Sequence, residues 1–154
     1  MRVSRCRTIL KYWLPVVLWM GLIFTASSDV QSMQRSSRII EPILRWLFPQ
    51  LASDTVQNVV YLVRKCAHLT EYAVLAWLFW RALRKPMPND LRPWTWSEAF
   101  IAFSCVALYA ASDEIHQAFV PSRQGSLWDV LLDSVGAALG LLALMAVGRW
   151  RKRW

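Results

Sequence analysis

The sequence is short of cysteine and of charged residues. Its three cysteines do not make a disulfide framework, because Cys66 and Cys105 fall inside apolar stretches and Cys6 precedes the first one. Charged residues are 18% of the chain and hydrophobic residues 56%, which is too apolar for an ordinary soluble domain of 154 residues. The chain also lacks the many alternating segments of about ten residues that a membrane β-barrel needs. A helical membrane protein is the class that remains.

Long apolar stretches occur at about 11–27, 60–80, 95–112 and 128–148. Each is about long enough to cross some 30 Å of hydrocarbon as a helix. Gly136 and Gly140 in the last stretch favour close helix packing. We therefore predict an all-α, integral membrane four-helix bundle that forms a single domain over residues 1–154. The predicted helices are about 11–27, 55–84, 95–117 and 128–148.

Basic residues gather at three places that this threading puts on one side of the membrane. They are Arg2, Arg5, Arg7 and Lys11 before the first helix, Arg81, Arg84, Lys85 and Arg92 after the second, and Arg149, Arg151, Lys152 and Arg153 after the fourth. A net charge of +8 could indicate nucleic-acid binding, but this distribution of the basic residues instead predicts that both termini are cytoplasmic. Residues 2–28 also have the basic start and small end residues of a cleaved signal peptide, and that alternative stays open.

The first outer loop has its own amphipathic pattern at about 35–48. The apolar residues that recur at helical spacing are Ile39, Ile40, Ile43, Leu44 and Leu47. The polar residues on another face of the same helix are Arg38, Glu41 and Arg45. We predict an interfacial helix that ends near Pro49 and serves as a lid or brace, with a separate binding module as the alternative. Asp54 and Gln57 then predict a capping box at the start of the second long helix.

Polar side chains concentrate in the outer halves of the last three helices. Helical spacing directs them to one outward-facing pocket, whose predicted members are Lys65, His68, Glu71, Asp113, Glu114, Gln117, Arg123, Asp129 and Asp133. Ionisable groups in membrane helices are costly unless paired or hydrated, so they predict a functional site. The structural alternative is a self-neutralising network, with His68 as a packing residue and Asp129 as the N-cap of the fourth helix.

Three motifs in these helices resemble the VanZ-like family. They are K-x-x-H-x-x-E-Y at 65–72, S-D-E-I-H-Q-x-F-x-P-x-R at 112–123 and D-V-x-x-D-x-x-G-x-x-x-G at 129–140. The family comprises bacterial membrane proteins named for a member linked to resistance against teicoplanin, a lipoglycopeptide, and Asn is common in it where this chain has Asp133. The resemblance implies a cell-envelope role and a multi-pass place in the bacterial plasma (inner) membrane.

The first hypothesis for function is a binding protein with membrane lipids as partners. Its outer pocket would hold a lipid head group, a cell-wall precursor or an amphiphilic drug such as a lipoglycopeptide, without a cofactor or metal. Arg64, Lys65 and Arg123 would hold anionic oxygens, and the acids would orient those bases or take an amine.

The alternative is a membrane-embedded enzyme that acts on a lipid-linked substrate. His68 or His116 would be its general base, and Glu71 or Glu114 its acid. A metal site at His68 and Glu71 is less favoured, because no second motif of that kind stands on a neighbouring helix. A channel or transporter is also less favoured, because the inner halves of the helices offer almost no ionisable groups.

Overall fold

The computed structural model describes residues 2–28, 32–86, 90, 92–120 and 125–154, and the side chains of all of these except 2–6, 28 and 32–36. The described residues form five α-helices and no strand, which confirms the all-α prediction. The helices are α1 (Arg2–Ser28), α2 (Ser32–Leu47), α3 (Ser53–Arg84), α4 (Trp96–Ala118) and α5 (Leu127–Trp150). The bounds of α3, α4 and α5 lie close to the predicted ones. α1 begins nine residues earlier than predicted, because Arg and Lys before the apolar run are themselves good helix formers.

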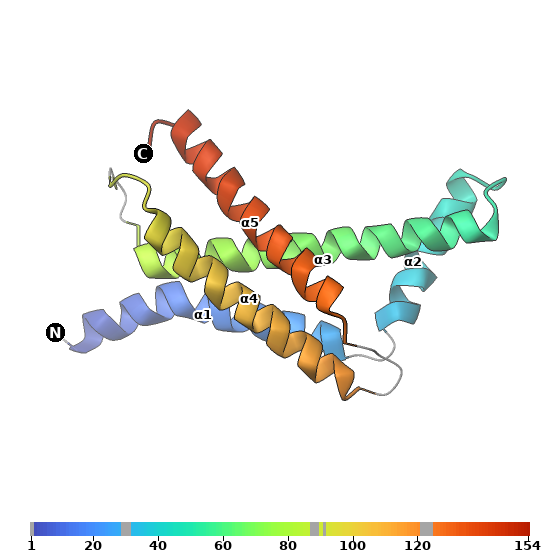
Figure 1. Ribbon diagram of the computed structural model, residues 1–154, viewed down its shortest axis with the longest axis horizontal. Helices are drawn as coiled ribbons and strands as arrows, with labels where there is room; N and C mark the ends of the chain where they lie inside the picture. Colours follow the sequence, from blue (N-terminus) through green and yellow to red (C-terminus); the bar gives the residue numbers. More distant parts are fainter. Residues whose placement is uncertain (1, 29–31, 87–89, 91, 121–124) are drawn as a thin grey trace.

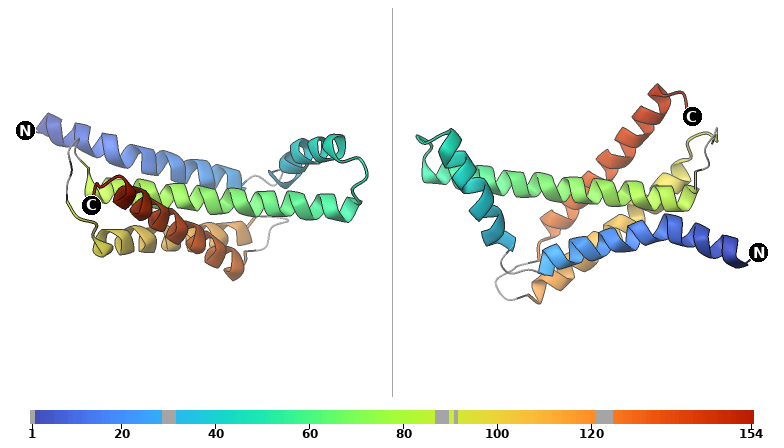
Figure 2. Two further views of the ribbon diagram at one scale, coloured as in Figure 1. Left: turned by 90° about the horizontal axis from the view of Figure 1, so that it is seen from above. Right: turned by 180° about the vertical axis from the view of Figure 1, so that it is seen from behind.

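α3 is the longest helix and the centre of the arrangement (Figures 1 and 2). It contacts all four of the other helices, and α4 also contacts α1 and α5. α1 runs alongside α3, whereas α4 and α5 cross it obliquely. The start of α1, the α3–α4 connection and the end of α5 all lie at one end of the molecule (Figure 1). The three basic clusters of the sequence therefore belong to the same end.

The core is formed where α1, α4 and α5 meet the C-terminal two thirds of α3. Its fully buried side chains include Ile23, Tyr72, Leu75, Val106 and Ala137. Glycines let α5 approach α3 closely, since a Cβ at Gly136 or Gly140 would fall within 3 Å of the α3 backbone. The predicted glycine contact between helices is confirmed.

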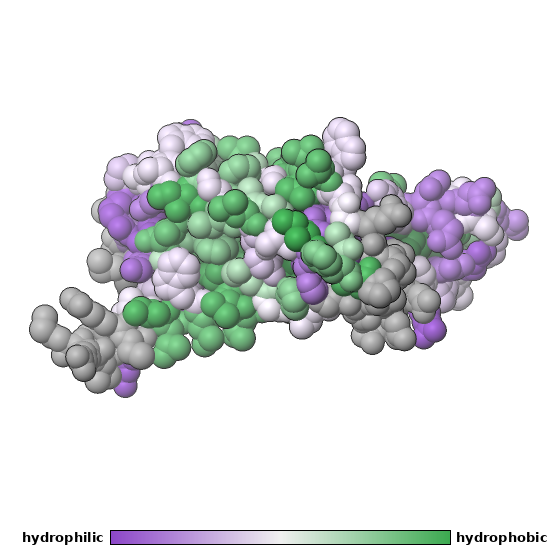
Figure 3. Space-filling model, turned by 60° about the horizontal axis from the view of Figure 1, so that its bottom comes forward, coloured by the Kyte–Doolittle hydropathy of each residue, from purple (hydrophilic) through white to green (hydrophobic). Residues whose placement is uncertain are grey.

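Two of the described helices are long and apolar enough to cross a membrane, judged by length and composition: α1 over Arg7–Ser27 and α5 over Leu127–Trp150. Large apolar side chains also remain exposed on α4, among them Phe100 and Leu108. In Figure 3 a band of apolar surface lies between two hydrophilic ends. This surface is typical of a protein whose sides face lipid.

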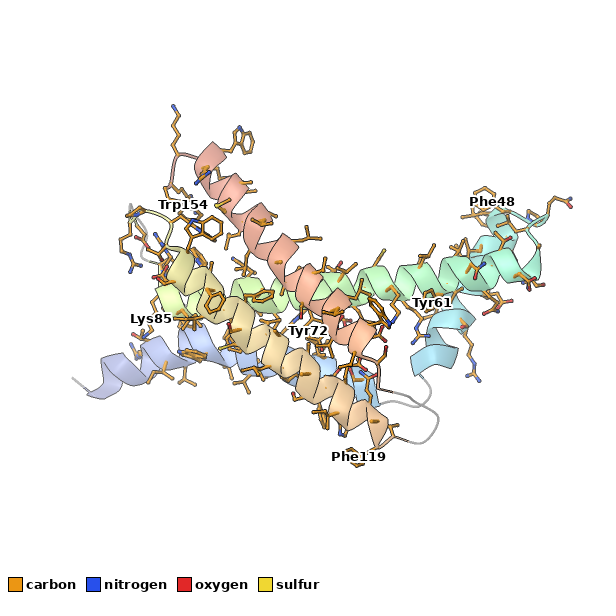
Figure 4. All side chains as sticks on the ribbon, viewed as in Figure 1. Phe48, Tyr61, Tyr72, Lys85, Phe119 and Trp154 are labelled. Carbon is orange, nitrogen blue, oxygen red and sulfur yellow. The ribbon has the colours of Figure 1, made fainter. Side chains whose placement is uncertain are left out.

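Arg84 is a buried contact residue at the end of the molecule where the basic clusters lie (Figure 1). Its side chain is buried, with Nε 3.3 Å from a carboxylate oxygen of Asp90 and Nη1 3.2 Å from one of Glu98. Its guanidinium also lies 5.3 Å and 5.4 Å from the ring centroids of Trp80 and Trp154. Arg84 thus joins the end of α3 to the start of α4 and to the C-terminal residue; Figure 4 labels the neighbouring Lys85 and Trp154 at this end.

The opposite end is an extension of α3 that α2 covers. α2 packs on the N-terminal part of α3, where Val56 and Val60 are buried, and Arg45 of α2 lies 3.4 Å from the hydroxyl of Ser53. The predicted capping box is wrong, because α3 begins before Asp54 and its N-cap is Ala52, which has no side-chain bond. Asp54 instead stands in the first turn, where its charge favours the helix dipole.

Candidate functional site

The predicted site residues that the structure describes form one group around Asp113 of α4, which we call the acidic cluster: Lys65, His68, Glu71, Asp113, Glu114, Gln117, Asp129 and Asp133. The side chain of Asp113 is 2% exposed, and its Oδ2 accepts hydrogen bonds from Ser27 of α1 at 2.7 Å and from Gln117 at 2.9 Å. The hydroxyl of Tyr72 on α3 also donates to Oδ2, at 3.4 Å. Tyr72 lies in the middle of the molecule (Figure 4). Three helices therefore hold one oxygen of this carboxylate, while its Oδ1 is buried and has no hydrogen-bond partner among the described residues.

Lys65 and Asp129 form an ion pair between α3 and α5. Lys65 Nζ lies 2.5 Å from Asp129 Oδ1, and the two side chains are 20% and 34% exposed. Asp129 is not the N-cap of α5, as the structural alternative predicted. That position belongs to Ser126, so Asp129 stands in the first turn and its carboxylate is directed to Lys65. The contact reduces the ability of Lys65 to bind an anionic ligand.

Glu114 holds the beginning of α5 against α4. Its side chain is 7% exposed, and its Oε2 accepts a hydrogen bond of 2.8 Å from the backbone N–H of Ser126. The neighbouring Gly125 leaves no room for a side chain, because a Cβ there would lie 2.5 Å from the carbonyl oxygen of Glu114. Glu114 and Gly125 together fix the position of the chain just before the acidic turn of α5.

His68 and Glu71 form the more exposed part of the cluster on α3. His68 Nδ1 lies 3.5 Å from Glu71 Oε2, and the side chains are 31% and 27% exposed. The backbone carbonyl of Glu71 accepts a hydrogen bond from the indole N–H of Trp19 on α1. The other histidine, His116, instead packs on Phe24, with the ring centroids 4.4 Å apart. An imidazole and a carboxylate are therefore adjacent at His68 and Glu71.

Asp133 lies one turn along α5 from Asp129 and is 3% exposed. Glu114, Asp129, Asp113 and Lys65 are all near enough to interact with it electrostatically. Three carboxyl groups, those of Asp113, Glu114 and Asp133, are thus nearly buried in one region where α4 meets α5. Like charges in such a region repel unless a cation or proton compensates them.

The structure brings together eight of the nine predicted site residues, through direct contacts or electrostatic proximity. The ninth, Arg123, lies outside the described residues. Sequence reasoning missed Ser27, which is the last residue of the first apolar stretch and resembled one of the small residues at the end of a signal peptide. It also left Tyr72 out of the predicted pocket, although the sequence places Tyr72 one turn after His68 on the same face of the helix.

Two further observations bear on ligands. A shallow hollow of about 360 Å³ lies on α2, lined by Ser37, Arg38, Glu41, Pro42 and Arg45, and so by none of the cluster residues. Within the part of the chain that the structure describes, no group of three or more His, Cys, Asp or Glu side chains is placed to hold a metal ion.

A protein-family model described as VanZ/LLP1 matches residues 12–148 of the chain. The matched range includes all three motifs, and it confirms the resemblance that they carry. No curated protein and no solved structure matches the chain.

Proposed function

Because the chain belongs to the VanZ/LLP1 family, we propose that it is a cell-envelope membrane protein whose outward-facing acidic cluster binds the polar part of an amphiphile. The occupant is a lipid head group, a cell-wall precursor or an amphiphilic drug, and the protein affects susceptibility to lipoglycopeptides. Family membership supports the envelope role, and the two apolar helices support membrane insertion.

The proposed topology has α1, α3, α4 and α5 crossing the bacterial plasma membrane as a four-helix bundle. The basic clusters gather at one end of the molecule (Figure 1), which supports cytoplasmic termini by the positive-inside rule. Asp113 lies 15 residues along α4 from Glu98, or about 22 Å at 1.5 Å per residue. The acidic cluster then lies in the outer half of the bilayer, and α2 stands outside it.

One observation carries the binding role: Asp113 is held by three helices through one oxygen and offers the other to no described residue. A buried polar atom without a partner costs free energy that an ordinary packing residue would not impose. The cost is explained if a ligand completes the site.

Charge-neutral variants of the cluster test this function in a bacterial strain that depends on the protein for a measured lipoglycopeptide susceptibility. We expect Asp113→Asn and Glu114→Gln to accumulate in the membrane as the wild type does and to lose the effect on susceptibility. Glu41→Gln is the matched control, because Glu41 is an acid of α2 that pairs with Arg45 outside the cluster. If both cluster variants lose the effect only in proportion to lost protein, the cluster is a structural network.

A second candidate, an enzyme acting on a lipid-linked substrate, is favoured by the contact between His68 and Glu71. A carboxylate beside an imidazole can orient it as a general base. Purified protein would then convert a labelled lipid or lipid-linked cell-wall precursor, and His68→Gln would abolish the product while leaving lipid retention unchanged. Absence of product over a broad lipid panel would remove this candidate.

A further inference from the structure

The buried members of the acidic cluster are Asp113, Glu114 and Asp133, and no described basic side chain pairs with them. Asp113, Glu114 and Asp133 are 2%, 7% and 3% exposed, and no Lys, Arg or His side chain in the described part of the chain forms an ion pair with them. Lys65 is near, but its ammonium is 2.5 Å from Asp129. An anionic group entering here would meet three carboxyls, and its electrostatic energy would be unfavourable.

The hydrogen bonds of Asp113 indicate what kind of group is missing. Ser27, Tyr72 and Gln117 all donate to Oδ2, so they fix the plane of the carboxylate and leave Oδ1 as an acceptor without a donor. A lipid phosphodiester or a carboxylate offers only acceptors at neutral pH and cannot satisfy this oxygen. A primary ammonium has three N–H donors and a positive charge, so it supplies both missing properties.

We propose that the cluster takes a primary ammonium group, with Asp113 Oδ1 as one acceptor and the nearby buried carboxyl of Asp133 as a second. This inference rests on the proposed binding function and narrows its ligand. The ammonium belongs to an ethanolamine-type phospholipid head group or to a free amine of the same chemistry. A quaternary ammonium is discriminated against, because it carries the charge without N–H donors.

Head-group selectivity of the wild-type protein is the first test, since it needs no variant to fold. The purified full-length chain is titrated in detergent with phosphatidylethanolamine, phosphatidylcholine and phosphatidylglycerol of identical acyl chains, and the retained lipid is counted by native mass spectrometry. We expect about tenfold tighter retention of phosphatidylethanolamine than of the other two, because the charged hydrogen bond to Asp113 is lost with either. Free ethanolamine should displace the bound lipid if the amine alone is recognised, whereas inorganic phosphate should not.

A variant then locates the selectivity. Asp113→Asn keeps an acceptor for the three donors but places an N–H where Oδ1 was, so retention of phosphatidylethanolamine should fall about tenfold. Glu41→Gln removes an acid elsewhere and should leave retention unchanged.

The outcomes separate this inference from the proposed function. Equal retention of phosphatidylethanolamine and phosphatidylglycerol, both lowered by Glu114→Gln, would overturn the ammonium site and leave a lipid-binding cluster. Equal retention of phosphatidylethanolamine and phosphatidylcholine would overturn the role of the N–H donors. Retention of no lipid by the wild type would refute both the inference and the lipid form of the proposed function.

Discussion

The contact between α3 and α5 makes a quantitative prediction for Gly136→Ala. A Cβ at this position would lie 2.5 Å from the carbonyl oxygen of Leu69 and 2.9 Å from its Cα, both of which are backbone atoms that cannot rotate away. To reach the 3.4 Å of ordinary contact, α5 must retreat from α3 by about 0.9 Å along that direction. Gly140→Ala meets Ala73 in the same way, at 2.7 Å from its carbonyl oxygen.

Two opposing terms set the size of the effect. Overpacking of this kind costs about 1–3 kcal/mol, and replacing Gly by Ala in a helix returns about 1 kcal/mol through intrinsic propensity. We therefore expect each variant to lower the free energy of unfolding by up to about 2 kcal/mol and the melting temperature by up to about 8 °C, and to be about 1–3 kcal/mol less stable than a Gly→Ala variant without the clash. Thermal unfolding of the purified protein in detergent, followed by circular dichroism, measures the change.

Gly21→Ala is the matched control, because a Cβ at Gly21 of α1 would have no atom within 4 Å. It keeps the propensity gain and lacks the clash, so its melting temperature should equal or slightly exceed that of the wild type. If Gly136→Ala and Gly140→Ala are as stable as Gly21→Ala, the close approach of α5 to α3 is refuted.

The remaining predictions concern the ion pairs of Arg84, Asp90 and Lys65. Arg84→Gln should lower the free energy of unfolding by about 3–5 kcal/mol, because it leaves buried acceptors without their cation, and thermal unfolding close to that of the wild type would contradict this. The hydrogen bond from Arg92 lowers the pKa of Asp90, so ionised Asp90 stabilises the fold above its unfolded pKa of about 4. The difference in the free energy of unfolding between wild type and Asp90→Asn should therefore be constant above that pH and become smaller as the pH falls further. A difference that does not change with pH would contradict the lowered pKa. A double-mutant cycle with Lys65→Met and Asp129→Asn should give a coupling energy of about 1 kcal/mol in thermal unfolding. A coupling energy near zero would mean that the ion pair does not stabilise the fold.

The presence of the helices and most of their bounds could be predicted from residue types in the sequence. Long apolar runs supply the helices, and Pro49, Pro93 and Gly125 stand in the connections around α3, α4 and α5. Hydropathy reports where a helix is apolar and not where its backbone begins, so the polar start of α1 was missed. The start of α3 was misjudged because Asp54 is equally favourable in a first turn and at an N-cap.

Helical spacing was enough to predict which residues belong to the acidic cluster, but not which of them contact one another. Helical spacing tells which residues share a face of one helix, whereas the partner across an interface depends on the rotation and axial offset of a second helix. Lys65 and Asp129 were therefore both singled out without being paired. Ser27 could not be found at all, because its role exists only where the end of α1 meets Asp113.

The ion pairs of Lys65 and Arg84 on α3 have a consequence for the membrane that the protein can occupy. Lys65 and Arg84 are 19 residues apart, so their ionic contacts are separated by about 28 Å of helix. In the proposed bundle this segment is a fixed span between two polar anchors, close to the thickness of an average hydrocarbon layer of about 30 Å. A thicker bilayer would have to thin around the protein, and a thinner one would have to be met by tilting α3. The same ion pairs that hold the helices together would thus sort the protein among membranes by thickness.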